Sequence, residues 1–413
     1  MRAAGGTPKL APRYAPTRPG TAARSFSGPS AARPRAPLLR VLFVTHTLPP
    51  TDRPHTNIGG MQRGAMELLR TLGQHPRVEL SSMVLHTSTR WEAVLTVGFI
   101  ARILATLPRR ARQAQADVVF FSAPVTAISL NALKRRLGGR PVVAIMHGLD
   151  VTWQVPPYQV AVRGMFRLLD AVFPISRATA EECLRRGAPP ERVHVIPFGV
   201  DTDRFTAAPD RDAMRRAVAE RLGLPEGAFV LVGLGRQVKR KGTAWFVEYV
   251  LPRLPPHVHY AVAGEGPEMD RIKEVAGPVK DRLHLLGRVS EEDLLTVLRG
   301  SDLFVMPNVP VEGDMEGQGL VMLEAGLCGL PAIAADMEGI SDVVAEGESG
   351  HLVPSMDAAA FTERILRYTD DPARLADLSR RTIAHVEQTF SWPAIADRYV
   401  TVMEGLVAAK RAS

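Results

Sequence analysis

The sequence has very little cysteine. Only Cys183 and Cys328 occur among 413 residues, and no histidine cluster at metal-ligand spacing accompanies them. A disulfide framework and a structural zinc site are therefore excluded as organising features, and a reducing cytosol suits the chain. The chain also lacks any uncharged run of about 18 apolar residues, which argues against a helix that spans a membrane.

Acidic side chains are absent from the first 40 residues, which contain eight basic ones. Residues 1–37 are rich in Ala, Pro, Gly and Ser without an apolar period, so we expect a disordered tail. An organellar transit peptide and a plain unstructured extension both fit this composition. The net charge of +8 is unevenly spread, because residues 41–205 hold 20 basic and 12 acidic side chains and residues 206–413 hold 23 and 31.

Short apolar runs alternate with segments of helical spacing, and the pattern restarts after residue 226. Such alternation predicts an α/β protein made of two doubly wound, Rossmann-like domains, at 38–205 and 206–385. A helix is expected from Trp392, within a C-terminal segment at 386–413. The expected strands lie at 38–45, 117–122, 141–146, 171–174, 194–197, 228–235, 259–264, 283–286, 303–306 and 331–334.

The first of two informative motifs lies at residues 235–242, directly after an expected strand. A glycine-containing turn between a strand and a helix exposes backbone N–H groups to an anion. Arg236 and Lys241 add fixed positive charge to this turn. The combination predicts a diphosphate site, and a solvated basic turn is the alternative.

The second motif places Glu316 and Glu324 on either side of Gly317-Gln318-Gly319-Leu320. We expect Glu316 at a helix N-terminus and Glu324 about two turns further on. Glutamates in such positions can accept hydrogen bonds from vicinal sugar hydroxyls. Charge stabilisation of a helix N-terminus is the alternative, but Glu324 lies among apolar residues, where a carboxylate needs a partner.

The ordered set of motifs resembles the retaining GT-B glycosyltransferases of family four, the glycosyl transferases group 1, over about residues 38–405. The resemblance implies a hexosyltransferase that uses a nucleotide-diphosphate sugar, with two domains facing across a cleft and a C-terminal helix that crosses back to the first domain. Besides the two motifs above, it rests on Gly59-Gly60, Met146-His147-Gly148, Pro174-Ile175-Ser176, residues 196–201, 264–267, 287–289, Ala325-Gly326, residues 329–331 and Ser391-Trp392-Pro393.

The resemblance also implies roles for single residues. Arg236 and Lys241 match the pair that grips the donor diphosphate, and Glu324 matches the glutamate that holds the ribose hydroxyls. Glu316 matches the glutamate that contacts the donor hexose, and His147 matches a histidine near the reacting centre. Further donor-binding positions are Gly59, Gly60, Val289, Gly317, Gln318, Gly319 and Leu320.

The sequence departs from the family pattern at two positions. Gln318 stands where the family usually has an aromatic residue, and Phe198 where it usually has Asn. The preference for a donor sugar therefore cannot be carried over. No acidic pair at metal-like spacing is evident, so we expect no metal and no cofactor besides the sugar donor, with the fixed cations stabilising the leaving diphosphate.

The basic first half favours an anionic or lipid-linked hydroxyl acceptor. Residues 91–114 are either an amphipathic helix that touches an anionic membrane or a core-packing helix with a solvated basic end. We expect a cytoplasmic protein whose contact with membranes, if any, is peripheral.

Two other functions stay open. The first is a nucleotide-sugar epimerase of the GT-B fold. The motif with Glu316 and Glu324 argues against it. The second is a basic nucleic-acid-binding protein. The basic half has few clustered aromatic residues to stack on bases, so no nucleic-acid partner is expected.

Overall fold

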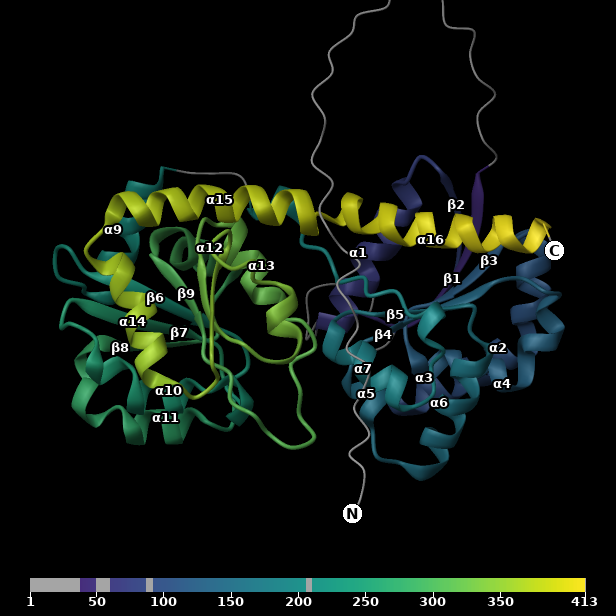
Figure 1. Ribbon diagram of the computed structural model, residues 1–413, viewed down its shortest axis with the longest axis horizontal. Coiled ribbons are helices and arrows are strands. Elements are labelled where there is room, and N and C mark those ends of the chain that lie inside the picture. Colours follow the sequence, from purple (N-terminus) through teal and green to yellow (C-terminus); the bar gives the residue numbers. More distant parts are fainter. Residues whose placement is uncertain (1–37, 50–59, 87–91, 206–209, 413) are drawn as a thin grey trace, which may run out of the picture. The chain divides into compact units, whose positions relative to one another are not determined.

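The computed structural model describes residues 38–49, 60–86, 92–205 and 210–412. Within these residues, the first half of the chain forms a parallel sheet with the strand order β2-β1-β3-β4-β5 (Figure 1). Four of its strands match expected apolar runs, because a parallel sheet covered on both faces is built from short, continuously apolar strands. The strands are β1 (Leu39–Leu48), β2 (Val78–His86), β3 (Val118–Phe121), β4 (Val142–Met146) and β5 (Ala171–Pro174).

Helices cover both faces of this first sheet. They are α1 (Gly60–Gln74), α2 (Glu92–Gln113), α3 (Pro124–Ala127), α4 (Leu130–Leu133), α5 (Leu149–Thr152), α6 (Pro156–Leu168), α7 (Arg177–Arg185) and the C-terminal helix α16 (Trp392–Ala412). Alternate residues of β1 belong to different cores. Leu42 and Val44 pack with α2, α4 and α6, whereas Val41 and Phe43 pack with α1 and α16.

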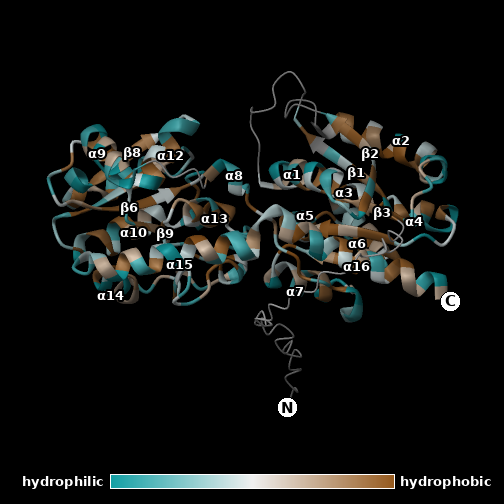
Figure 2. Ribbon diagram, turned by 90° about the horizontal axis from the view of Figure 1, so that it is seen from above, coloured by the Kyte–Doolittle hydropathy of each residue, from teal (hydrophilic) through white to brown (hydrophobic). Residues whose placement is uncertain are grey.

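Helix α2 packs into the first core along most of its length, and Figure 2 colours much of it as hydrophobic. Its last turn is basic and exposed, with Arg110 and Arg112. Segment 91–114 therefore contains a core-packing helix with a basic end, although Val94 and Val97 near its start are exposed. The buried stripe consists of Phe99, Ile103, Leu107 and Ala111. Within the described ranges, no helix combines the length and apolar character that crossing a membrane requires.

The second half forms a parallel sheet with the order β11-β10-β9-β6-β7-β8. Its strands are β6 (Phe229–Leu234), β7 (Val258–Ala263), β8 (Leu283–Gly287), β9 (Leu303–Met306), β10 (Ala332–Ala335) and β11 (Gly350–Val353). Its helices are α8 (Thr202–Phe205), α9 (Arg211–Leu222), α10 (Thr243–Tyr249), α11 (Met269–Val275), α12 (Glu291–Gly300), α13 (Leu320–Leu327), α14 (Ala358–Thr369) and α15 (Pro372–Phe390). The prediction of two Rossmann-like α/β domains is confirmed. Residues 1–37 and 206–209, at the expected tail and boundary, lie outside the described residues.

The prediction of a strand at 194–197 is wrong. The N–H groups of His194 and Ile196 do donate to carbonyl oxygens of β5, but the segment is irregular. The next N–H in this alternation, that of Phe198, donates to Gln318 Oε1 instead of to β5, so no regular ladder continues. The segment instead leads into residues 198–200, where the two halves of the molecule meet.

The chain returns to the first half where α15 ends and α16 begins. The N–H of Val200 donates to the Phe390 carbonyl oxygen at 2.8 Å. A Cβ on Gly199 would lie 2.8 Å from the Trp392 ring, so only glycine fits there. Helix α16, expected from Trp392, is present and packs on the first sheet (Figure 1).

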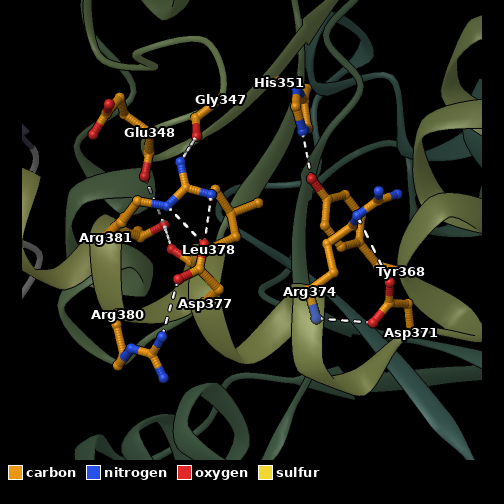
Figure 3. A network of polar contacts seen from close by, with 11 residues as sticks. Gly347, Glu348, His351, Tyr368, Asp371, Arg374, Asp377, Leu378, Arg380 and Arg381 are labelled. Carbon is orange, nitrogen blue, oxygen red and sulfur yellow. Dashed lines mark hydrogen bonds and ion pairs between the residues drawn. The ribbon is translucent and has the colours of Figure 1, made fainter.

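Helix α15 holds α13 in place. A Cβ on Gly326 would lie 3.0 Å from Val386 Cγ2, so the two helices approach closely at a glycine. Ser379 Oγ also donates to the Gly329 carbonyl oxygen at 2.6 Å. Figure 3 shows further ties of α15: Arg381 binds the carbonyl oxygen of a neighbouring loop, and Asp371 caps the first turn.

Candidate functional site

The carboxyl end of β6 opens into a tight turn. Gly235 has φ 138° and Gly242 has φ 67°, conformations that favour glycine. A Cβ on Gly264 would lie 2.0 Å from the Gly235 carbonyl oxygen, so the loops after β6 and β7 pack backbone to backbone. The chain passes through a 3-10 turn at Lys239–Lys241 into α10, which has only seven residues. The positive charge of this turn therefore comes from its side chains rather than from a long helix.

Arg236 and Lys241 both lie in this turn. Arg236 is exposed, and its side chain makes no hydrogen bond or ion pair with the residues that the structure describes, although its backbone carbonyl oxygen accepts from the Val238 N–H at 2.9 Å. Lys241 folds back over the turn, since its Cε lies 3.6 Å from the Cβ position of Gly235. Its Nζ donates to Glu316 Oε2 at 2.6 Å. Two cations are thus available at the end of one strand.

Glu316 is a buried carboxylate surrounded by donors. Its Oε2 accepts hydrogen bonds from Lys241, from Arg240 and, at 3.3 Å, from Asn308. Burial by itself raises the pKa of Glu316, but the charges of Lys241 and Arg240 outweigh it and leave the pKa below its ordinary value. Glu316 is therefore ionised at neutral pH.

The loop after Glu316 touches the first half of the molecule. A Cβ on Gly317 would lie 3.0 Å from the His147 carbonyl oxygen and 3.2 Å from Ile175 Cδ1. The structure therefore brings the Glu316 loop and the turn after β4 into direct contact. A side chain at 317 would crowd this contact and push the two turns apart.

The prediction that Glu316 lies at a helix N-terminus is wrong, because α13 begins at Leu320 and Gly319 is its N-cap. Glu324 lies on α13 and is buried, with 6% of its surface exposed. Arg63, on α1 of the first half, donates to its Oε1. Burial is the largest influence on Glu324 and raises its pKa, while the Arg63 charge partly opposes this. The carboxylate thus has the partner that its apolar neighbours require, and that partner comes from the other half of the chain.

His147 follows β4 in the first half. Its Nε2 lies 2.7 Å from the Ser122 carbonyl oxygen. Because a carbonyl can only accept, Nε2 carries a proton, and Nδ1 has no partner among the described residues. Asp150 Oδ1 accepts from the His147 backbone N–H at 3.0 Å and steadies the turn. The Phe198 ring packs against the imidazole, with the centroids 5.3 Å apart.

Unpartnered polar atoms gather where β1, β3 and β4 end. They are Thr45 Oγ1, His46 Nδ1, Ser122 Oγ and His147 Nδ1, all buried and without a hydrogen-bond partner in the described part of the chain. Burial, and then the neighbouring His147, lower the pKa of His46 to about 4, so this imidazole is neutral. Since buried polar groups are nearly always hydrogen-bonded, these atoms are suited to bind hydroxyl groups.

The other predicted residues are placed as follows. Gly60 is the first residue of α1, and its Cβ position lies 3.4 Å from Leu320 Cδ1, on the first residue of α13. Gly319 has φ 75° and immediately precedes α13. Val289 follows β8, two strands from β6 in the sheet, and Gly59 lies outside the described residues.

Gln318 is buried, and its side chain is engaged with Phe198 rather than open. Its role as a donor-binding residue stays a prediction.

Sequence reasoning missed several residues of the site. Arg240 is adjacent to Lys241, and Asn308 follows the end of β9, so proximity to strand ends could have indicated both. His46 follows the same rule at β1. Arg63 carries no local signal, because its partner is 261 positions away.

No group of three or more His, Cys, Asp or Glu residues in the described ranges is placed to hold a metal ion.

Two family models match the chain. One, described as glycosyl transferases group 1, covers residues 228–371, and the other, described as glycosyltransferase family 4, covers residues 58–204.

Curated relatives and a solved structure are also similar. The chain is 31% identical over 304 residues to a GDP-mannose-dependent alpha-(1-6)-phosphatidylinositol monomannoside mannosyltransferase of Mycolicibacterium smegmatis, covering 72% of this chain and 78% of that protein. It is 28% identical over 396 residues to the corresponding enzyme for the monoacylated substrate in Corynebacterium glutamicum, covering 88% and 98%. The crystal structure of Anabaena Alr3699/HepE in complex with UDP matches with a TM-score of 0.68, covering 89% of this chain and all of that one. At 18% identity, this last likeness concerns the fold alone.

Proposed function

We propose that this chain, which belongs to the glycosyltransferases of family four and has the GT-B fold, transfers a mannosyl unit from GDP-mannose to a glycolipid hydroxyl. We further propose that transfer retains the anomeric configuration and needs no metal ion. Membership of the family makes the protein a glycosyltransferase that uses a nucleotide-sugar donor. The identities of donor and acceptor, the stereochemistry and the metal independence are proposals.

The observation that carries the proposal is the meeting of two sets of groups. Arg236, Lys241 and ionised Glu316 lie together in the second half, and the Gly317 loop presses against His147 of the first half. A donor bound on the cations would therefore have its sugar close to His147. This arrangement supports group transfer between a ligand on one half and a ligand on the other.

The proposed chemistry is a displacement at the sugar C1. The bond from C1 to the diphosphate oxygen breaks with its electron pair on that oxygen, and a bond from C1 to the acceptor oxygen forms. The acceptor proton passes to the departing phosphate oxygen. Arg236 and Lys241 would stabilise the negative charge that develops, each by about 1.5–3 kcal/mol, or about 10- to 150-fold in rate.

Two relatives name GDP-mannose as donor and phosphatidylinositol mannosides as acceptors. An inositol or mannose ring offers several hydroxyl groups, and the first half offers unpartnered polar atoms at Thr45, His46, Ser122 and His147. These atoms suit a polyhydroxylated acceptor. Neutral His46 can accept a hydrogen bond from such a hydroxyl without adding charge.

Contact with a membrane surface is also proposed. Helix α2 exposes Val94 and Val97, which are 65% and 68% exposed, and its far end carries exposed arginines. An exposed apolar start and an exposed basic end on one helix suit an anionic lipid surface. Vesicle flotation with and without anionic lipid tests this contact.

A panel of GDP-, UDP-, ADP- and dTDP-sugars, scored by thermal shift and by transfer to phosphatidylinositol mannosides, tests the proposed function. A bound donor raises the melting temperature in proportion to ln(1 + [L]/Kd). We expect GDP-mannose to stabilise the protein most and to be the donor that is used. A sugar epimerised in the absence of acceptor would favour the epimerase alternative instead.

A further inference from the structure

The side chain of Gln318 binds the backbone of Phe198 twice. Its Oε1 accepts from the Phe198 N–H at 2.7 Å, and its Nε2 donates to the Phe198 carbonyl oxygen at 2.9 Å. Both residues are buried, with 3% and 1% of their surface exposed. The amide thus satisfies both backbone polar groups of Phe198, and it does so from the other half of the chain, 120 positions away.

The ring of Phe198 extends this contact into the first half. It lies beside His147, with centroids 5.3 Å apart, and beside Trp392 at 5.8 Å. It also lies over Gly64 of α1, where a Cβ would approach the ring to 2.3 Å. A continuous chain of contacts therefore runs from the Glu316 loop through Gln318 and Phe198 to His147.

Gln318 and Phe198 are also the two positions at which the sequence departs from the family pattern. The family usually has an aromatic residue at the first and an amide at the second, and this chain has the reverse. In the structure the two positions touch. The two departures therefore occur at one contact. In this chain the amide is at position 318 and the aromatic ring is at position 198.

We propose that Gln318 is a positioning residue, which locks the donor loop 316–319 to Phe198 and so fixes the donor sugar relative to His147. The proposal rests on the proposed function, because it concerns the same site. Gln318 acts through Phe198 and does not touch the sugar with its side chain. The nucleotide half of the donor, held by Arg236, Lys241 and Glu324, does not depend on this lock.

The test compares the wild type with Gln318→Glu and Gln318→Met. The carboxylate of Gln318→Glu would face the Phe198 carbonyl oxygen without a proton to donate, and Gln318→Met fills the space with no hydrogen bond. We expect kcat to fall about 10- to 100-fold in both variants, while the Kd of GDP and the KM of the donor stay within about twofold of wild type.

The double exchange Phe198→Asn with Gln318→Phe supplies a rescue. The double variant places the amide at 198 and the ring at 318. Its kcat should therefore exceed the kcat of Phe198→Asn alone and of Gln318→Phe alone. Hydrogen exchange at the Phe198 N–H gives a readout independent of activity, and exchange should be faster in Gln318→Met than in the wild type.

Gln159→Glu is the matched control. The Gln159 amide also binds backbone carbonyl oxygens, those of Val151 and Trp153, but within the first half alone. We expect this variant to lower the melting temperature and to leave kcat unchanged. A loss of kcat equal to that in Gln318→Glu would mean that disturbing any side-chain amide bound to the backbone is enough, and would overturn the proposal.

Two further outcomes would also overturn it. An unchanged kcat in both Gln318 variants would exclude positioning. A changed preference among donor sugars with the same nucleotide would show that Gln318 contacts the sugar. GDP binding in each variant shows that the donor half is folded, and an inactive wild type would count against the proposed function rather than against Gln318.

Discussion

The ion pair between Arg63 and Glu324 leads to a prediction about stability. The side chains are 43% and 8% exposed, so the carboxylate is buried and its partner is only partly so. Arg63→Met removes the charge and keeps an aliphatic side chain of similar reach. Breaking a fully buried pair costs about 3–5 kcal/mol and an exposed pair contributes about 0.2–1 kcal/mol, so this variant should lose about 1–2 kcal/mol.

Glu324→Gln tests whether the unpaired charge is the cause. In the Arg63→Met background it removes the buried carboxylate, so the double variant should be more stable than Arg63→Met alone. Urea unfolding of the four proteins gives the coupling through a double-mutant cycle. A thermal scan of the same proteins provides a check by a second method.

The pH dependence adds a second criterion. Burial raises the pKa of Glu324. The protonated carboxyl therefore stabilises the fold at pH values below the pKa of Glu324 in the unfolded chain, and this stabilisation is lost as pH rises through its pKa in the folded protein. Without Arg63 that pKa should rise further. The deficit of Arg63→Met should therefore be larger at about pH 8 than at about pH 5. The reasoning would be refuted if the stability that Arg63→Met loses did not change with pH. It would also be refuted if the double variant were no more stable than Arg63→Met.

Three other predictions concern metal, pH and packing. Transfer should survive EDTA, and an activity lost in EDTA and restored by Mg²⁺ or Mn²⁺ would contradict metal independence. Because burial and the neighbouring His147 lower the pKa of His46 from 6.5 to about 4, the stability that its neutral form contributes is lost as pH falls through this range, by about 1.4 kcal/mol per pH unit. His46→Gln should lessen that fall in urea titrations, and an equal fall in both proteins would contradict the assignment. Gly64→Ala places a Cβ against the Phe198 ring and should cost about 1–3 kcal/mol in urea, whereas Gly98→Ala, where nothing lies within 4 Å of the Cβ position, should not.

Much of the fold could be predicted because buried parallel strands appear in the sequence as short apolar runs. Strand β2 escaped prediction because it lies at the edge of its sheet, where only Val78 and Met83 of its residues are buried, so it has no continuous apolar run. Strand β11 escaped because its residues, Gly350-His351-Leu352-Val353, include a glycine and a polar side chain and so form no continuous apolar run. The segment 194–197 resembled a strand in composition, but after His194 and Ile196 the next N–H, that of Phe198, bonds to Gln318 and not to β5.

Some residues of the site could be predicted from local motifs, and others could not. Arg236, Lys241, Glu316 and Glu324 could be singled out because each lies in a local motif beside a strand end or a helix start. The contacts of Arg63 with Glu324 and of Phe198 with Gln318 could not, because they join residues 261 and 120 positions apart. Such pairs are set by how the two halves pack, which no local pattern encodes.

The most direct test of the account measures GDP binding and mannosyl transfer in Arg236→Ala and Lys241→Ala. Arg271→Ala and Lys273→Ala, which change the same residue types on the exposed helix α11, are the controls. We predict that the first pair loses about 10- to 150-fold in transfer rate and most of the thermal stabilisation by GDP, while the controls match the wild type. Wild-type transfer in both Arg236→Ala and Lys241→Ala would contradict the claim that these cations hold the donor diphosphate.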